Sequence, residues 1–335
     1  MIYFKRWINC EAKMRRFYLG VGAQKSATTW LFQQLIKSEN YKPGFCKEYH
    51  IFDYFEHLEI HKNTRKNAHI RIKNFTNTYQ KQHPIAINSN FQNRSEKTIE
   101  TFYENIDNYY DYFDSILTDE ASFSADISPG YSMLSAETLS NIHDNFEKRG
   151  IKLKVIFFMR EPISRLESEL RMKLRRDGAL GKKSNTEMTT KIKQKLEAGE
   201  LNYHGNYSYT CAQIDASIPN EDIFYGFYET LFLEEETNRL SKFTNIPPNS
   251  FDSNNKINKT MRPFHYKLKD INEFQGYANK QYKFVKDRFG FDLAIWNQEL
   301  EKLSKKKKHR SSVAMPSFHK LRKALIAKLI RRLDD

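Results

Sequence analysis

One lysine and three hydroxyl side chains follow a short apolar run near the start of the chain. The run, residues 17–21, predicts a buried strand, and apolar residues spaced along 30–36 predict a helix after it. The side chains between these elements are Lys25, Ser26, Thr28 and Thr29. A plain structural turn needs no such set. A phosphate site does, because N–H groups and the dipole at a helix start attract an anion and lysine adds a full charge.

The residue before the lysine distinguishes two kinds of phosphate loop. The nucleoside-triphosphatase pattern G-x-x-x-x-G-K-[ST] requires glycine there, and this chain has Gln24. Residues 24–31 (QKSATTWL) instead resemble the 5′-phosphosulfate loop of sulfotransferases, which transfer sulfate from 3′-phosphoadenosine 5′-phosphosulfate (PAPS). Trp30 matches a tryptophan that stacks on adenine in cytosolic aryl sulfotransferases. The resemblance implies that PAPS is bound by Lys25, Ser26, Ala27, Thr28, Thr29 and Trp30.

A carboxylate and an imidazole stand two residues apart in the next motif. Alternation along an extended segment would place Glu48 and His50 on one face, as a proton-abstracting pair. Taken alone, the pair is more typical of a charged surface than of a catalytic site. The motif Glu-x-His-x-Phe-Asp, however, resembles the segment that follows the phosphosulfate loop in sulfotransferases acting on heparan-type sugars. This resemblance implies Glu48 as the base for the acceptor hydroxyl, with His50 as its neighbour.

A short polar segment, residues 126–131, resembles the [DE]-x-[ST]-P-x-Tyr motif of the same sugar-modifying enzymes. Several of those enzymes have lysine at the position of Ile127. We therefore expect a charge near the sulfate to be absent here or to come from another residue.

A second phosphate motif follows the most apolar run of the chain. Residues 152–159 (KLKVIFFM) predict a buried strand of a parallel sheet, and Arg160 leaves its carboxyl end, where open α/β sheets bind ligands. The pattern R-x-P-x-x-R-x-x-S resembles the 3′-phosphate site of sulfotransferases, which implies Arg160 and Ser168 as ligands. Glu161 departs from the commoner asparagine. A triphosphatase more often places an aspartate for Mg²⁺ after such a strand, so no metal is expected.

Composition limits the class of protein and its partners. The chain has 335 residues, 39% of them hydrophobic, and a net charge of +14, which suits an anionic partner but does not choose one. Its three cysteines, Cys10, Cys46 and Cys211, show no disulfide or metal spacing and indicate a reducing compartment. No apolar stretch approaches the roughly 18 residues of a membrane span, and no signal-peptide core is present. We therefore expect a cytoplasmic protein.

These motifs predict an α/β fold with three layers, a P-loop-like domain around a central parallel sheet of about five strands. We expect a basic extension over 1–14, the sulfotransferase domain over 15–300, and a polybasic linker with a basic amphipathic helix over 301–335. That helix fits an anionic membrane surface or packing on protein equally well. Within the domain, 98–117 predicts one helix with core aromatics. Residues 175–200 predict solvated surface, with a mobile lid or an acceptor-side loop as the alternative.

The sequence thus favours a PAPS-dependent sulfotransferase acting on a hydroxyl, with a glycan as the expected acceptor. The loop at 24–31 is aryl-type whereas Glu48 and His50 are sugar-type, so the acceptor stays open. A P-loop kinase or NTPase is the first alternative, against which Gln24 and Arg160 argue. A non-enzymatic protein that binds polyanions is the second; it explains the charge but not the ordered motifs, and no nucleic-acid-binding signature is present.

Overall fold

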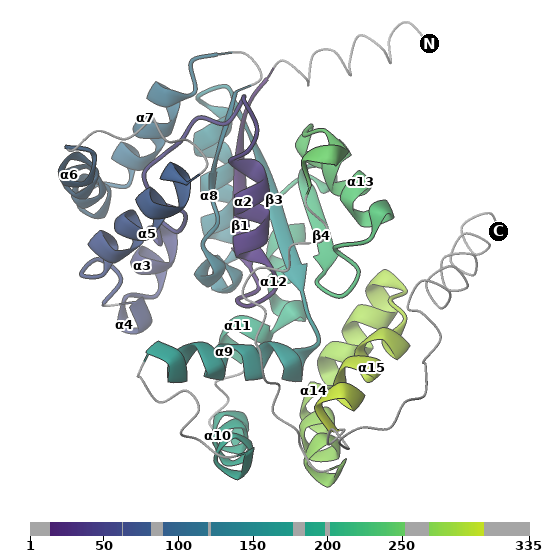
Figure 1. Ribbon diagram of the computed structural model, residues 1–335. Coiled ribbons are helices and arrows are strands. Elements are labelled where there is room, and N and C mark those ends of the chain that lie inside the picture. Colours follow the sequence, from purple (N-terminus) through teal and green to yellow (C-terminus); the bar gives the residue numbers. More distant parts are fainter. Residues whose placement is uncertain are drawn as a thin grey trace, which may run out of the picture. The chain divides into compact units, whose positions relative to one another are not determined.

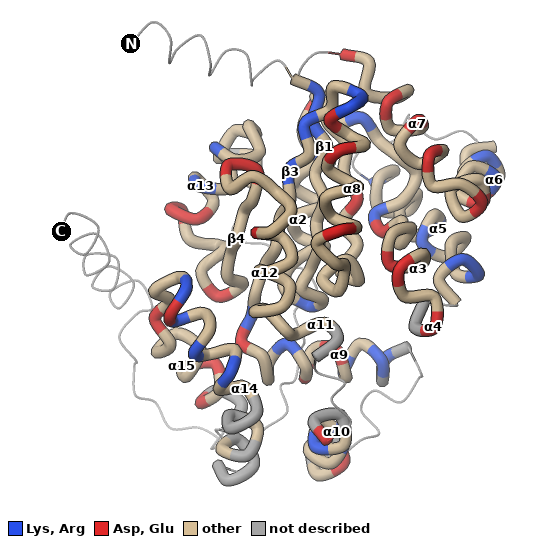
Figure 2. Tube along the Cα trace, turned by 180° about the vertical axis from the view of Figure 1, so that it is seen from behind, with Lys and Arg blue, Asp and Glu red and all other residues tan. Residues whose placement is uncertain are grey.

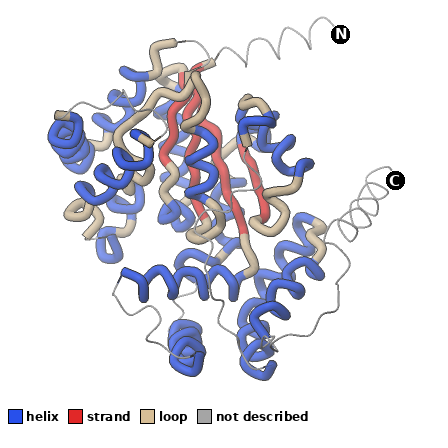
Figure 3. Tube along the Cα trace, in the orientation of Figure 1, coloured by secondary structure: helices blue, strands red, loops and turns tan. Residues whose placement is uncertain are grey.

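A parallel sheet forms the centre of the computed structural model, which describes residues 14–61, 63–81, 90–119, 122–176, 185–197, 202–251 and 268–304. Within these residues the sheet has four strands in the order β2-β1-β3-β4 (Figure 3). We expected about five. The sequence patterns missed β2 because it is four residues long and includes a serine and an aspartate. The strands are β1 (Arg15–Gly22), β2 (Phe123–Asp126), β3 (Ile151–Met159) and β4 (Ile223–Phe227).

Helices cover both faces of the sheet, which gives the three expected layers (Figure 1). Side chains alternate between the faces of a strand, so neighbouring residues belong to different cores. Tyr18 and Ile156 lie in the core covered by α2 and α13. Phe17 and Val155 lie in the core covered by α8 and α12. These helices are α2 (Thr28–Leu35), α13 (Glu234–Thr244), α8 (Ala136–Glu147) and α12 (Tyr207–Asp215).

Between α2 and β2 in the sequence, the chain forms a group of helices. The single helix predicted over 98–117 is wrong, because the chain turns at Asn105. The backbone of Asn105 is extended, and its side-chain oxygen accepts a hydrogen bond from the Asp107 N–H at 2.9 Å. The aromatic residues, Tyr109 and Phe113 among them, are buried as expected. The helices are α3 (Phe52–Glu56), α4 (Leu58–His61), α5 (Ala68–Gln80), α6 (Phe91–Glu104) and α7 (Asp107–Ile116).

The remaining helices lie toward the carboxyl ends of the strands, where α9 follows β3 directly (Figure 1). Part of the loop predicted over 175–200 is the helix α10, which buries Ile192. The last helix of the described residues ends at Ser304, a few residues beyond the domain boundary expected at 300. These helices are α9 (Pro162–Arg176), α10 (Asn185–Glu197), α11 (Asn202–Gly205), α14 (Leu268–Phe289) and α15 (Leu293–Ser304).

The chain divides into two units, 1–304 and 305–335. The second unit, with the predicted amphipathic helix, lies outside the described residues, as does most of the N-terminal extension. By sequence the second unit has eleven Lys and Arg and only two Asp, so it supplies most of the +14 charge. On the described residues, basic and acidic positions are interspersed (Figure 2). None of the described helices is long and apolar enough to cross a membrane.

Candidate active site

The turn between β1 and α2 has the backbone of an anion-binding loop. Lys25 and Ala27 are both in the left-handed region, with φ of 71° and 72°, and turns of this kind point N–H groups into one concavity. Ala27 stands at the N-cap of α2, and no side chain caps the first N–H groups of the helix. The Ser26 hydroxyl is buried and has no hydrogen-bond partner among the described residues. A phosphate oxygen could accept hydrogen bonds from these groups.

The structure brings the two predicted phosphate motifs together. The Arg160 guanidinium donates a hydrogen bond from Nη1 to the Lys25 carbonyl at 3.0 Å, across 135 residues of sequence. Its other side stacks on the Tyr228 ring, with Cζ 4.3 Å from the ring centroid. Arg160 Nε is buried and makes no hydrogen bond within the described part of the chain. The guanidinium is therefore held in place and keeps a donor for a ligand.

Several cations surround the end of Lys25. Burial lowers the pKa of the Lys25 ammonium, and the nearby charges of Arg160, Arg175 and Lys47 lower it further. Only the Glu48 carboxylate acts in the opposite direction among the main causes. Like charges held close together repel one another unless an anion joins them. The charge pattern therefore fits a site for a ligand with several negative charges.

The residues after Arg160 have separate roles in the turn. Glu161 is fully buried and caps α9, because its carboxylate accepts hydrogen bonds from the N–H groups of Ile163 at 3.0 Å and Ser164 at 2.6 Å. Glu161 thus has a structural role in the turn. Ser168 is half-buried on α9, and its contact with a 3′-phosphate stays a prediction.

Three further loop residues were predicted to bind the donor. Thr28 is buried and Thr29 half-buried, both in the first turn of α2. Trp30 is 2% exposed and packs edge-on against Phe232, with ring centroids 5.3 Å apart, and near Phe251 at 6.0 Å. Its stacking on adenine stays a prediction.

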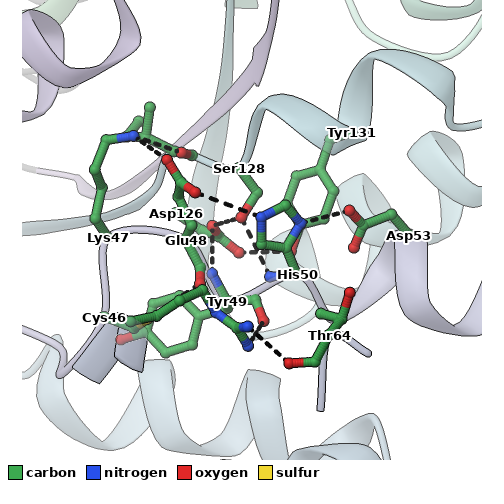
Figure 4. Close-up of polar contacts among 12 residues, drawn as sticks. Cys46, Lys47, Glu48, Tyr49, His50, Asp53, Thr64, Asp126, Ser128 and Tyr131 are labelled. Atoms are coloured by element: carbon green, nitrogen blue, oxygen red, sulfur yellow. Dashed lines mark hydrogen bonds and ion pairs between the residues drawn. The ribbon is translucent and has the colours of Figure 1, made fainter. Parts of the chain in front are cut away.

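A chain of acidic and basic side chains runs from Lys47 to Asp53 (Figure 4). Lys47 forms an ion pair with Glu48, and the other carboxylate oxygen of Glu48 lies 3.5 Å from His50 Nε2. His50 Nδ1 lies 2.6 Å from Oδ2 of the fully buried Asp53. Glu48 and His50 do lie together, although His50 is left-handed, with φ of 55°, rather than part of an extended segment. A Cβ at Gly130 would sit 2.1 Å from Asp53 Oδ2, so only glycine leaves room for this arrangement.

The charges in this row of side chains determine which of Glu48 and His50 can accept a proton. Burial would raise the pKa of Glu48, but the Lys47 ammonium and the contact with His50 outweigh it and hold that pKa well below its usual value. Burial also opposes charge on His50, yet Asp53 and Glu48 raise its pKa to about 9. At neutral pH His50 is therefore an imidazolium with no lone pair for a proton. Glu48 is the group that can accept one, although its ion pair with Lys47 makes it a weak base.

Asp126 at the end of β2 holds the backbone of this segment. Its carboxylate accepts hydrogen bonds from the Tyr49 N–H at 3.2 Å, from Ser128 Oγ at 2.5 Å and from Tyr131 OH at 2.6 Å. Ser128 Oγ in turn accepts the His50 N–H at 3.2 Å. The motif over 126–131 therefore positions Glu48 and His50 through their backbone.

Position 127 cannot bring a charge to the site. Ile127 is fully buried, and its Cδ1 would lie 2.7 Å from a Cβ at Gly20, so its side chain points into the core beside β1. Lys47 lies next to it instead: the Ile127 N–H donates to the Lys47 carbonyl at 2.8 Å, and Lys47 Nζ donates to the Ile127 carbonyl at 3.4 Å. Sequence reasoning missed Lys47 and the role of Asp53. The signals were available, since Lys47 adjoins Glu48 and Asp53 ends the motif.

Comparison with solved structures agrees with this architecture. The fold is similar to the sulfotransferase from Alicyclobacillus acidocaldarius, with a TM-score of 0.51 and 16% identity over 84% of this chain and 99% of that one. The sulfotransferase domain of the Synechococcus PCC 7002 olefin synthase has a TM-score of 0.41 at 14% identity, covering 79% of this chain and 94% of that domain. The sulfotransferase domain of the curacin biosynthetic pathway has a TM-score of 0.39 at 16% identity, covering 72% and 78%.

No family model matches the chain, and no curated protein matches it. The first structural likeness establishes the fold: this chain has the three-layer α/β fold of a sulfotransferase.

Proposed function

We propose that this protein is a sulfotransferase that transfers the sulfuryl group of PAPS to an acceptor hydroxyl. The observation that carries the proposal is the hydrogen bond from Arg160 to the carbonyl of Lys25, which joins the two phosphate motifs in one site. PAPS has phosphate groups on both the 3′ and the 5′ position of its ribose, so it needs two such sites at once. The unpartnered Ser26 hydroxyl and Arg160 Nε provide donors that fit its oxygens.

Each group of residues has a role in an in-line displacement at sulfur. Lys25 and the N–H groups of its loop stabilise the negative charge that grows on the leaving 5′-phosphate. Arg160, with Ser168, binds the 3′-phosphate and fixes the nucleotide. Glu48 accepts the proton of the attacking hydroxyl, while His50 and Asp53 hold the carboxylate in position. No step requires a metal ion.

We propose a glycan hydroxyl as the acceptor. The contacts among Glu48, His50 and Asp53 support this choice, because they follow the motif that resembles heparan-type sulfotransferases. A phenol remains the competing acceptor in any screen.

We further propose that the protein works in the cytoplasm, with the basic segment 305–335 docking on the anionic inner face of the membrane. Cys46 and Cys211 support a reducing compartment, since both are buried free thiols. The concentration of positive charge in the last 31 residues supports the membrane part of the proposal.

The experiment that tests the function is incubation with PAPS and panels of glycans and phenols, followed by mass spectrometry. Addition of one sulfuryl group to a glycan, lost in Lys25→Met, is the expected result. ATP with Mg²⁺ is run in parallel, and phosphorylation in place of sulfation would make the protein a kinase. Sulfation of phenols alone would keep the donor and overturn the glycan assignment.

A further inference from the structure

Arg71 of α5 contacts the backbone that carries Glu48. Its Nε donates a hydrogen bond to the Glu48 carbonyl at 2.8 Å, and its Nη2 donates to the Tyr49 carbonyl at 3.2 Å. Its Nη1 donates to the Thr64 carbonyl at 2.7 Å, shortly before α5 begins. A guanidinium is planar and presents its five N–H donors in a fixed fork. One side chain therefore ties the Glu48 segment to the start of α5.

Tyr103 of α6 supports this guanidinium from a second helix. Its hydroxyl accepts a hydrogen bond from Arg71 Nη2 at 2.8 Å and donates one to the Tyr49 carbonyl at 3.1 Å. Tyr103 is 4% exposed, and a buried, low-dielectric surrounding strengthens such bonds. Arg71 and Tyr103 thus form a clamp on two consecutive carbonyls, and both helices that follow the segment contribute to it.

The clamp acts on a stretch of backbone that is not extended. Along an extended strand successive carbonyls point in opposite directions, yet those of Glu48 and Tyr49 meet one guanidinium. His50 follows in the left-handed region, with φ of 55°. On the other side, the N–H groups of Tyr49 and His50 donate to Asp126 and Ser128. Side chains from two sides therefore determine how this segment presents the Glu48 carboxylate.

We propose that Arg71 is a positioning residue for the base: it fixes the backbone of Glu48 and does not itself touch donor or acceptor. This inference rests on the proposed function. A displacement of about 1 Å at a reacting group can lower a rate by about a hundredfold. Lysine at position 71 would keep the positive charge but could not contact three carbonyls with a planar fork. Loss of the fork should therefore slow transfer and leave nucleotide binding intact, because Lys25 and Arg160 lie on other elements.

The test compares Arg71→Lys with Arg65→Lys. Arg65 is the matched control, because it also precedes or lies near the start of α5 but pairs with Glu100 of α6 at 2.6 Å. Arg71→Lys should lower kcat by about tenfold to a hundredfold and leave KM for PAPS unchanged, whereas Arg65→Lys should change neither. Calorimetry with adenosine 3′,5′-bisphosphate shows that each variant is folded, since binding should be retained.

Tyr103→Phe provides a second variant if Arg71→Lys does not fold. It removes one hydroxyl from the clamp and leaves the ring in place. A smaller loss of kcat in the same direction, with bisphosphate binding retained, is expected. An unchanged kcat in Tyr103→Phe would then overturn the inference.

The same change in a Glu48→Gln background gives a readout that a general loss of stability would not move. If Arg71 acts through Glu48, Arg71→Lys should cost little more once the carboxylate is gone. An equal loss in both backgrounds would assign Arg71 to the fold as a whole and overturn the inference. If the wild type transfers sulfate while Arg71→Lys matches Arg65→Lys, the role of Arg71 is overturned and the proposed function stands. A wild type that transfers no sulfate from PAPS would overturn the proposed function, and the inference with it.

Discussion

Replacing Asp53 by asparagine should remove the positive charge of His50 at neutral pH. Asp53 is fully buried and its Oδ2 lies 2.6 Å from His50 Nδ1, and it is the leading cause that raises the His50 pKa from 6.5 to about 9. A rise of about two and a half units corresponds to roughly 3 kcal/mol in favour of the imidazolium. Asparagine keeps the shape of the side chain, which Gly130 accommodates closely, and removes the charge.

The direction of the His50 pKa shift sets the pH range in which the contact with Asp53 stabilises the folded protein. Because the folded pKa is raised, the stabilisation is fully present below about pH 6.5 and is lost as the pH rises through about 9. Burial raises the pKa of Asp126 to about 6, so that group acts mainly at lower pH. The free energy of unfolding of the wild type minus that of Asp53→Asn should therefore shrink by roughly 2–3 kcal/mol between pH 6.5 and 9.5.

Two measurements check this prediction. Histidine side-chain NMR should show His50, identified by loss of its signal in His50→Gln, titrating near 9 in the wild type and below 7 in Asp53→Asn. Urea unfolding of both proteins between pH 6.5 and 9.5 gives the difference in their free energies of unfolding. Asp119→Asn is the control, since Asp119 pairs with Lys42 at the surface. Equal titration of His50 in the wild type and in Asp53→Asn would refute the reasoning.

Three further predictions concern the site and the C-terminus. Arg160→Ala should weaken binding of adenosine 3′,5′-bisphosphate by about 1.5–3 kcal/mol and Ser168→Ala by about 1, because a charge-assisted hydrogen bond contributes more than a neutral one; calorimetry showing the reverse order would remove Arg160 from the site. Glu48→Gln should keep nucleotide affinity while transfer falls by about 10²–10⁴-fold, and His50→Ala should cost less; a nearly active Glu48→Gln with an inactive His50→Ala would favour a histidine base. A chain ending at Ser304 should keep nucleotide binding and lose affinity for anionic vesicles; loss of nucleotide binding would show that 305–335 supports the fold.

The sequence predicted the elements whose patterns are local. β1 contains the apolar run 17–21 and β3 contains the apolar run 155–159, and both strands were predicted from these runs. β2 was missed because its four residues, which include a serine and an aspartate, are buried by pairing with β1 and by helix packing rather than marked by an apolar pattern of their own. The break at Asn105 was missed because a side-chain hydrogen bond, and not a glycine or proline, turns the chain there.

The contacts inside the site depend on residues far apart in sequence, so patterns could not give them. The approach of Arg160 to Lys25 results from the parallel pairing of β1 with β3. The position of Lys47 beside β2 results from the backbone hydrogen bond between Ile127 and Lys47, which are 80 residues apart. Sequence could name Glu48 and His50, but only the structure shows that Asp53 contacts His50, which raises the pKa of His50, and that Lys47 pairs with Glu48.

The central claim is that the Lys25 loop and the Arg160 turn form one site for a nucleotide with phosphates at both ends. Calorimetric titration of the full-length protein in EDTA tests it most directly, with adenosine 3′,5′-bisphosphate, AMP and ATP as ligands. The account predicts that the bisphosphate binds without metal and that AMP, which lacks the 3′-phosphate, binds more weakly by about tenfold or more. Binding of ATP that requires Mg²⁺, with no binding of the bisphosphate, would contradict it.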